Sequence, residues 1–199
     1  MSTTAAIRPP LLSARPLAAV VLAALCAGCH NLPDRPGANA EQLLRGTLES
    51  TRPIDVAVAP VVNRSGSEGV PLADLRQAFH AGLVKRRYSP LALEYVDRHV
   101  VEASYAPGAV DEDAVLRVEV TVWDASRWKS HGVLAVEIEA WMLDARDGGN
   151  PLWGGRLTRK LSLAQDRKGY ATEAMHLREI SADLAQELLE VLPARAARP

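Results

Sequence analysis

IDVAVAPVV (residues 54–62) decides the fold class, because this run is almost entirely apolar and rich in β-branched side chains. Such a run is typical of a β-strand that is covered on both faces, as in a sheet with helices packed against it. NRSGS (63–67) follows and ends the strand with residues that favour turns. The stretch therefore predicts an α/β domain.

The residues after this strand predict further helices and strands in alternation. Apolar residues recur every three or four positions over 71–87 and predict an amphipathic helix, which ends before Pro90. A second short strand is predicted over 91–96, and a short helix over 98–104 with Asp97 as its N-cap. Since a two-residue hairpin cannot join parallel strands, the first helix is expected to make a right-handed crossover.

The second half of the chain alternates between apolar and polar residues over 115–123 and 133–143. This alternation predicts antiparallel strands with one buried face and one solvent-exposed face. Val118, Val120 and Val122 are expected to share the buried face of the first of these strands. With a further strand over 152–163 and a closing helix over 172–192, the expected fold is α/β: a single mixed β-sheet of about five strands with helices packed on it.

The N-terminal residues have the pattern of a secretory leader. Arg8 and Arg15 form a basic region, and residues 17–25 form a short apolar run. Because a membrane span needs about 20 apolar residues, this run predicts a signal peptide rather than a transmembrane helix.

LCAGC (25–29) sharpens this prediction, because it resembles the lipobox of bacterial lipoproteins. In a lipobox, small residues precede a cysteine that is acylated and becomes the new N-terminus. The resemblance makes Cys29 the expected lipidation site. Cys26 stands where a lipobox has an aliphatic residue, so a plain secretory signal with an incidental cysteine is the alternative.

Four segments are expected along the chain: a lipoprotein signal peptide (1–28), an acylated N-terminus with a flexible tether (29–52), an α/β periplasmic domain (53–193) and a disordered tail (194–199). The tether is polar, contains proline and glycine and lacks periodicity over its first part. One or two helical turns are expected within 40–48.

Composition excludes several classes of function. The 199 residues are 48% hydrophobic and 24% charged with a formal net charge of −1, so no basic footprint for nucleic acid is present. Cys26 and Cys29 are the only two cysteines, so the domain has no disulfide, cysteine metal site or cysteine nucleophile. The five histidines of the chain lack metal-ligand spacing and no Gly-x-Ser-x-Gly motif occurs, so we expect no metal, no cofactor and no enzymatic activity.

Three groups of residues are candidates for binding. The turn of Asn63, Arg64 and Ser65 follows the C-terminal end of a strand, where ligands often bind in α/β proteins. It can equally be an ordinary turn that ends the strand. Glu137 and Glu139 share a face, as a catalytic pair would, although a solvated charge ladder is the commoner arrangement of such carboxylates. Its expected partners are Arg156 or Lys160 across the sheet.

Four tryptophans form the third group and lie near the ends of the later strands. A tryptophan rim offers a large contact area to a partner, and it can equally be the core edge of a small sheet. Both interpretations stay open for these residues: Trp123, Trp128, Trp141 and Trp153.

Several motifs resemble known envelope proteins. IDVAVAPVVNRSG (54–66) resembles the start of the N-terminal region of TolB, of the curli-secretion lipoprotein CsgG and of the penicillin-binding-protein activator LpoB. RYSPLALEYVD (87–97), DAVLRVEVTVWD (113–124) and MLDARDGGNPLWGG (142–155) resemble a family of bacterial lipoproteins typified by a neisserial surface antigen. The resemblance implies a TolB N-terminal-like sandwich and a membrane-tethered accessory without catalytic residues.

These observations predict a non-enzymatic accessory or assembly factor in an envelope transport, secretion or cell-wall system. Its expected partners are envelope proteins, a further copy of itself, and the membrane through fatty acyl chains such as palmitate, but not nucleic acid. His30 rather than aspartate follows Cys29, which under the enterobacterial sorting rule favours the outer membrane, facing the periplasm. The alternative is a small-ligand receptor of the envelope that uses the turn at 63–69.

Overall fold

The computed structural model describes residues 39–99, 105–162 and 173–196. All of them belong to one unit, Pro36–Pro199. The signal peptide, Cys29 and the first part of the expected tether lie outside the described residues. No helix within the described ranges is long and apolar enough to cross a membrane.

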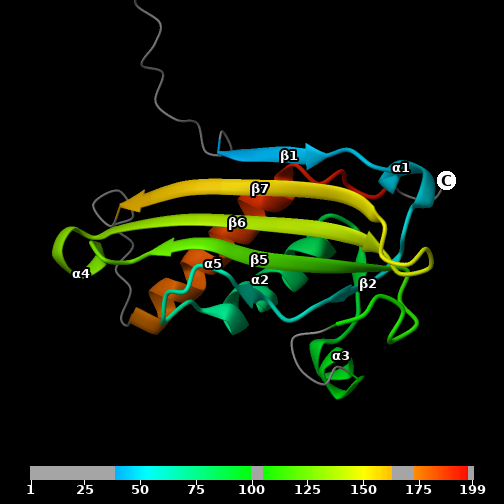
Figure 1. Cartoon of the computed structure of the whole chain (residues 1–199), viewed down its shortest axis with the longest axis horizontal. Helices are drawn as coiled ribbons and strands as arrows, with labels where there is room; N and C mark the ends of the chain where they lie inside the picture. The colour runs from blue at the N-terminus through cyan, green and yellow to red at the C-terminus, as the bar shows by residue number, and fades with distance from the viewer. Residues whose placement is uncertain (1–38, 100–104, 163–172, 197–199) are drawn as a thin grey trace, which may run out of the picture. The chain divides into compact units, whose positions relative to one another are not determined.

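The described residues form one mixed sheet of seven strands in the order β1-β7-β6-β5-β2-β4, with β3 also paired to β5 (Figure 1). The pairs among β1, β7, β6 and β5 are antiparallel, and those of β2 with β4 and of β2 and β3 with β5 are parallel. This confirms the expected α/β class with two strands more than expected. The strands are β1 (Ala40–Leu44), β2 (Asp55–Val58), β3 (Val62–Asn63), β4 (Ser89–Pro90), β5 (Ala114–Asp124), β6 (Val133–Asp144) and β7 (Pro151–Ser162).

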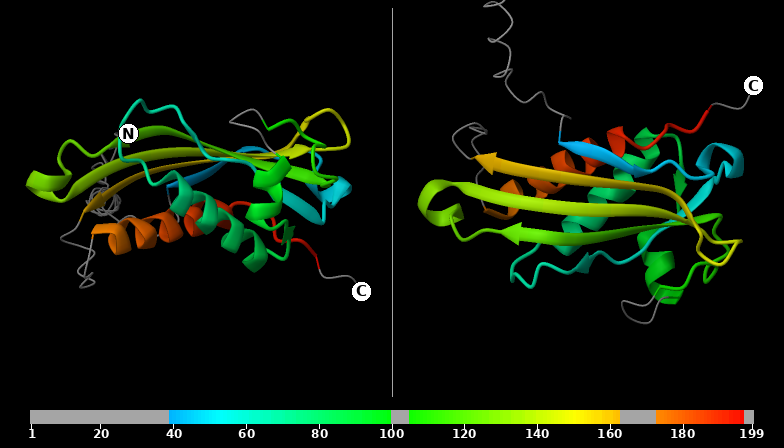
Figure 2. Two further views of the ribbon diagram at one scale, coloured as in Figure 1. Left: turned by 90° about the horizontal axis from the view of Figure 1, so that it is seen from below. Right: turned by 45° about the horizontal axis from the view of Figure 1, so that its top comes forward.

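Two long helices cover one face of the sheet and enclose the main core (Figure 2). They lie side by side, with Leu189 occupying the space that a side chain at Gly82 would need. Short helices stand at the connections and at the sheet's edge. The helices are α1 (Leu48–Thr51), α2 (Leu72–Lys85), α3 (Leu93–His99), α4 (Trp128–His131) and α5 (Glu173–Glu190).

Apolar side chains of β2 and of the residue after it are buried on both faces of the sheet, as the apolar run predicts. Val56 and Val58 belong to the main core, whereas Ala57 and Ala59 belong to a smaller cluster with Val96 of α3. Since successive side chains of a strand point to opposite faces, this second cluster lies on the face away from α2 and α5. The expected single strand over 54–62 is divided at Pro60, which has no N–H to donate.

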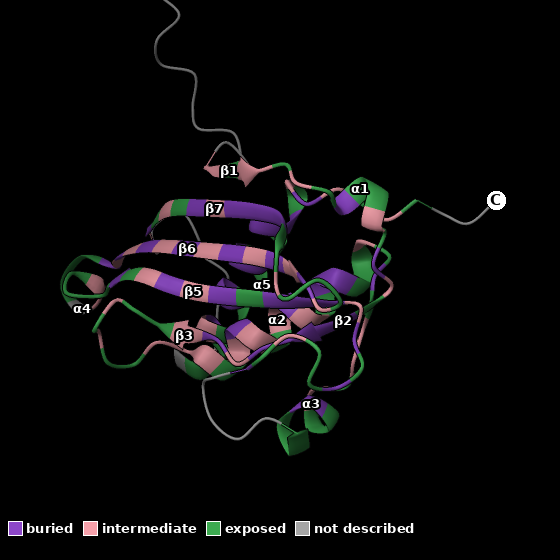
Figure 3. Ribbon diagram, turned by 45° about the vertical axis from the view of Figure 1, so that its right-hand side comes forward, coloured by how far each residue is buried: buried purple, intermediate pink, exposed green. Residues whose placement is uncertain are grey.

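The long antiparallel strands follow the predicted alternation, with one irregularity. Buried and partly exposed residues alternate along the whole of β6 (Figure 3). In β5 a register shift between Val120 and Val122 reverses the pattern, so Val122 is 40% exposed and Trp123 only 3%. The prediction that Val122 shares a face with Val120 is therefore wrong, because a bulge turns the strand there.

The segment after β4 also differs from the sequence prediction. Residues 91–96 were expected as a strand, but the structure has the two-residue β4 followed by helix α3. The carbonyl oxygen of Ala92 accepts hydrogen bonds from the N–H groups of Tyr95 and Val96, at 3.0 and 3.1 Å. A short apolar run does not distinguish helix from strand by its periodicity, which explains the error. Residues 100–104 of the expected next helix lie outside the described residues.

Backbone hydrogen bonding extends beyond both expected boundaries of the domain. The tether was expected through residue 52, yet Ala40–Leu44 pairs with β7 as the edge strand β1, and Leu48 of α1 is buried in the main core. At the other end the tail was expected to begin at 194, but the N–H of Arg195 donates to the carbonyl of Arg86 at 3.0 Å. Backbone hydrogen bonds to distant residues hold both segments in place, and amino-acid composition does not reveal such bonds.

Candidate functional site

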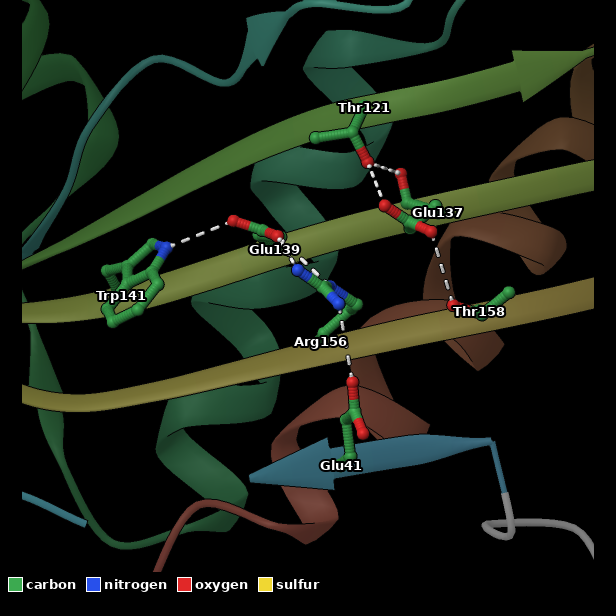
Figure 4. Close-up of polar contacts among 7 residues, drawn as sticks. All are labelled: Glu41, Thr121, Glu137, Glu139, Trp141, Arg156 and Thr158. Atoms are coloured by element: carbon green, nitrogen blue, oxygen red, sulfur yellow. Dashed lines mark hydrogen bonds and ion pairs between the residues drawn. The ribbon is translucent and has the colours of Figure 1, made fainter. Parts of the chain in front are cut away.

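Polar side chains gather on the sheet face that α2 and α5 leave uncovered, which we call the open face (Figure 4). Its side chains come from the edge strand and the three long antiparallel strands, and most of them are partly exposed. The open face consists of Glu41 of β1, Thr121 of β5, Glu137, Glu139 and Trp141 of β6, and Arg156 and Thr158 of β7.

An ion-pair ladder crosses the open face from β6 to β1. The Nε and Nη2 atoms of Arg156 donate to Oε1 of Glu139 at 3.0 and 2.7 Å. Nη1 of Arg156 lies 3.5 Å from Oε1 of Glu41. The expected cross-strand charge ladder is therefore present with Arg156 as its cation, while Lys160 lies opposite Ala135 on β6.

Two threonine hydroxyl groups contact the carboxylate of Glu137, the second acidic side chain of β6 on the open face. The hydroxyl of Thr121 donates to Oε1 of Glu137 at 2.9 Å, and that of Thr158 lies 3.5 Å from Oε2. Glu137 and Glu139 thus point to one face, as the alternation predicts, and each has its own donors. The arrangement presents fixed hydrogen-bonding groups along a flat surface.

The structure separates the four tryptophans instead of gathering them at one rim. Trp123 and Trp153 lie in the main core, 3% and 0% exposed, and the indole N–H of Trp153 donates to the carbonyl of Val191 at 3.2 Å. Trp128 packs against the core, and its ring centroid lies 5.2 Å from that of His176. Trp141 alone of the four belongs to the open face.

The turn after β3 is held by hydrogen bonds among its own residues. Oδ1 of Asn63 accepts from the N–H and the hydroxyl of Ser65, at 3.0 and 2.7 Å, and Nδ2 of Asn63 donates to the carbonyl of Ser67 at 2.8 Å. Nε of Arg64 lies 3.6 Å from Oε2 of Glu119 on β5. The three residues are brought together as an exit turn from the strand, and ligand binding there stays a prediction.

A buried carboxylate that the sequence did not single out organises the loop before β5. Oε1 of Glu112 accepts from the Tyr105 hydroxyl and the Gly108 N–H, both at 2.7 Å, and Oε2 accepts from the Val110 N–H at 2.9 Å. Burial favours a raised pKa for Glu112, but these hydrogen bonds outweigh it and lower the pKa. Burial, followed by the bond to Glu112, raises the pKa of Tyr105.

No sequence signal marks Glu112, because it stands in a run of three acidic residues that looks uniformly solvated. Its neighbour Asp113 accepts hydrogen bonds from the N–H groups of Ile54 and Asp55, at 2.8 and 3.3 Å. Burial again opposes ionisation, and these bonds together with Arg146 lower the pKa of Asp113. Glu112 therefore holds the loop together, and Asp113 joins the end of the loop to the start of β2.

Two further features bear on ligand binding. Within the described ranges, no group of three His, Cys, Asp or Glu side chains lies close enough to hold a metal ion. A partly open cavity of about 230 Å³ lies between the ends of α2 and α5, away from the open face. Its lining residues are Gly82, Lys85, Arg86, Gln186, Leu189 and Glu190.

No protein-family model and no curated protein match this sequence. Several solved structures are similar in fold. The PelC dodecamer from Paraburkholderia phytofirmans has 17% identity and a TM-score of 0.47, over 78% of this chain and 98% of that one. Lipoprotein GNA1162 from Neisseria meningitidis has 18% identity and a TM-score of 0.46, over 70% of this chain and 99% of that one.

LpoB from E. coli is also similar, with 10% identity and a TM-score of 0.41, over 78% of this chain and 82% of that one. A neisserial lipoprotein and LpoB are both among the proteins that the sequence motifs resemble. The expected relation to CsgG and to the N-terminal region of TolB stays a prediction.

Proposed function

We propose that the protein is a non-enzymatic accessory of the bacterial envelope that holds other envelope proteins of a transport, secretion or cell-wall system. Acyl chains on Cys29 anchor it in the outer membrane, facing the periplasm. The observation that carries the proposal is the edge strand β1, whose outer side pairs with no other strand among the described residues.

Strand addition is the contact that this edge supports. β1 pairs with β7 on one side, and within the described residues no strand pairs with its other side. The free backbone N–H and C=O groups of an edge strand can bind an extended segment of another protein. Gln42 in the middle of β1 is exposed.

Because the tether confines the domain near the membrane, a modest affinity of the domain for other envelope proteins is sufficient. An extended chain from Cys29 to Ala40 spans at most about 40 Å, at about 3.5 Å per residue, so the domain stays close to the membrane. Confinement of this kind raises the effective concentration of the domain near other envelope proteins. Each buried methylene of an acyl chain adds about 0.8 kcal/mol, so several chains give lasting attachment.

Site-specific photocrosslinking in whole cells tests this function. A photoreactive residue at Gln42 is expected to form an adduct of discrete mass with an envelope protein or with a second copy of the chain. The matched control is the same residue at Val84, which is 56% exposed on α2, a helix that contacts β2 and β4 at the opposite end of the strand order from β1. Equal labelling from both positions, or no adduct from Gln42, would contradict docking at β1.

A further inference from the structure

Helices α2 and α5 run side by side in the same direction, so their C-terminal ends meet (Figure 2). Near their first turns, Nε of Arg178 lies 3.6 Å from Oδ1 of Asp74. At the other end, Nζ of Lys85 donates to Oε1 of Gln186 at 3.4 Å. The cavity of about 230 Å³ lies between these C-terminal ends. Pockets that enclose a drug-sized ligand have about 300–1,000 Å³, so this cavity suits a smaller group.

Basic side chains outnumber acidic ones around this cavity. Lys85 and Arg86 line it from α2, and Glu190 is the only carboxylate among the described residues that line it. Arg195 lies next to Arg86, because its N–H donates to the Arg86 carbonyl at 3.0 Å. Burial raises the pKa of Tyr88 to about 12 and the charges of Arg86 and Arg195 act in the opposite direction, so both guanidinium groups lie near this hydroxyl.

These positive charges are not neutralised by the part of the protein that the structure describes. Its ion pairs include none of Lys85, Arg86 and Arg195. Nη2 of Arg86 donates to the carbonyl of Leu192, but the buried Nε atoms of Arg86 and Arg195 have no acceptor in the described protein. Three cations against the single carboxylate of Glu190 leave an excess of two positive charges. Because like charges repel one another, a bound anion would stabilise this arrangement.

The excess charge and the number of donors favour phosphate over carboxylate as that anion. A phosphate monoester carries a charge of about −1.5 to −2 at pH 7 and three strong acceptor oxygens, whereas a carboxylate carries one charge and two oxygens. The ammonium of Lys85 has three N–H donors, and the guanidinium of Arg86 presents its donors as a planar fork that matches phosphate.

We propose that the cavity binds the phosphate group of a small phosphate monoester, held by Lys85 and Arg86 with the charge of Arg195 close by. Since the cavity is partly open, the group that is esterified to the phosphate can extend into solvent. The carboxylate of Glu190 repels the same anion and lowers the affinity. The site uses no residue of β1, so it is independent of the docking proposed at that edge.

Isothermal titration calorimetry tests this site with the full-length protein in detergent and glycerol 3-phosphate as the probe. The wild type is expected to bind glycerol 3-phosphate and to bind glycerate, which presents a carboxylate instead, more weakly. Lys85→Gln should weaken phosphate binding about fivefold, as expected on loss of an exposed charge pair. Glu190→Gln should strengthen it by about two- to fivefold, because the repelling charge is removed.

Lys160→Gln is the matched control, because it removes an exposed lysine from β7 and should leave binding unchanged. Lys85 and Glu190 are both exposed, so neither substitution is expected to disturb the fold, and a gain of affinity in Glu190→Gln cannot result from unfolding. Adducts from Gln42 should persist in Lys85→Gln, so the two proposals fail separately.

Four results would each overturn the phosphate site. They are a wild type that does not bind glycerol 3-phosphate with a Kd below about 1 mM, equal binding of glycerate, unchanged binding in Lys85→Gln, and weaker binding in Glu190→Gln. A loss in Lys160→Gln as large as that in Lys85→Gln would also overturn it, because the phosphate would then respond to the net charge of the protein and not to this cavity.

Discussion

Replacement of Trp153 by alanine is expected to lower the free energy of unfolding by about 3–5 kcal/mol, the usual cost of removing a large buried aromatic side chain. Trp153 is fully buried, and its ring lies against Gly155, where an added Cβ would come within 2.7 Å of Cζ2. The substitution also leaves the carbonyl of Val191 without its indole donor. Urea unfolding followed by circular dichroism measures the change.

Trp141→Ala is the matched control, because it removes the same side chain from the open face of the neighbouring strand. Its cost is expected to stay below about 1 kcal/mol, as for most partly exposed positions. If Trp153→Ala were as stable as Trp141→Ala, the assignment of Trp153 to the core would be wrong. The comparison also decides which tryptophans are free to contact a partner.

Replacement of Glu112 by glutamine is expected to cost about 2–4 kcal/mol, because charge-assisted hydrogen bonds contribute about 1.5–3 kcal/mol each. The carboxylate accepts three hydrogen bonds, whereas the glutamine amide has one acceptor oxygen and turns an NH₂ group toward the donors. The loop from Tyr105 to Glu112 should loosen, which hydrogen exchange of the Gly108 and Val110 amides would show.

The same substitution should flatten the dependence of stability on acid pH. The folded-state pKa of Glu112 is lowered below its ordinary value of 4.5, so this group stabilises the fold fully above that pH. Its contribution is lost as the pH falls through the folded-state pKa. Below about pH 4.5 the wild type should therefore lose stability more steeply than Glu112→Gln.

Glu94→Gln serves as the control for this pH dependence, because Glu94 is exposed in the first turn of α3. It should keep the acid slope of the wild type. An unchanged slope in Glu112→Gln, measured as urea midpoints between pH 3 and pH 6 (roughly the range in which carboxyl groups titrate), would contradict the role assigned to this carboxylate.

The sequence predicts the long antiparallel strands well, because a two-residue period of apolar side chains is explained by a strand with one face in the core. In β6 every second side chain enters the core, and the residues between them form the open face. The pairing of Glu139 with Arg156 follows from the same alternation, since oppositely charged side chains on facing strands attract one another. The helix over 72–85 is equally clear from its three- and four-residue spacing.

The parts that the sequence does not predict depend on long-range pairing. AEQLL (40–44) has no alternating pattern, and only its alignment with β7 makes it a strand. Trp153 is followed by Gly154 and Gly155 in a stretch where all residues are buried, so its face cannot be deduced from alternation. The role of Glu112 also cannot be predicted from the sequence, because its hydrogen-bond donors become its neighbours only when the loop folds.

The mass of the protein isolated from cell envelopes tests the central claim, which is attachment through Cys29, most directly. We expect a chain that begins at Cys29 and carries the added mass of its acyl groups, together with fatty-acid label that disappears in Cys29→Ser. A chain that begins elsewhere, an unmodified Cys29, or label that persists in Cys29→Ser would contradict the account.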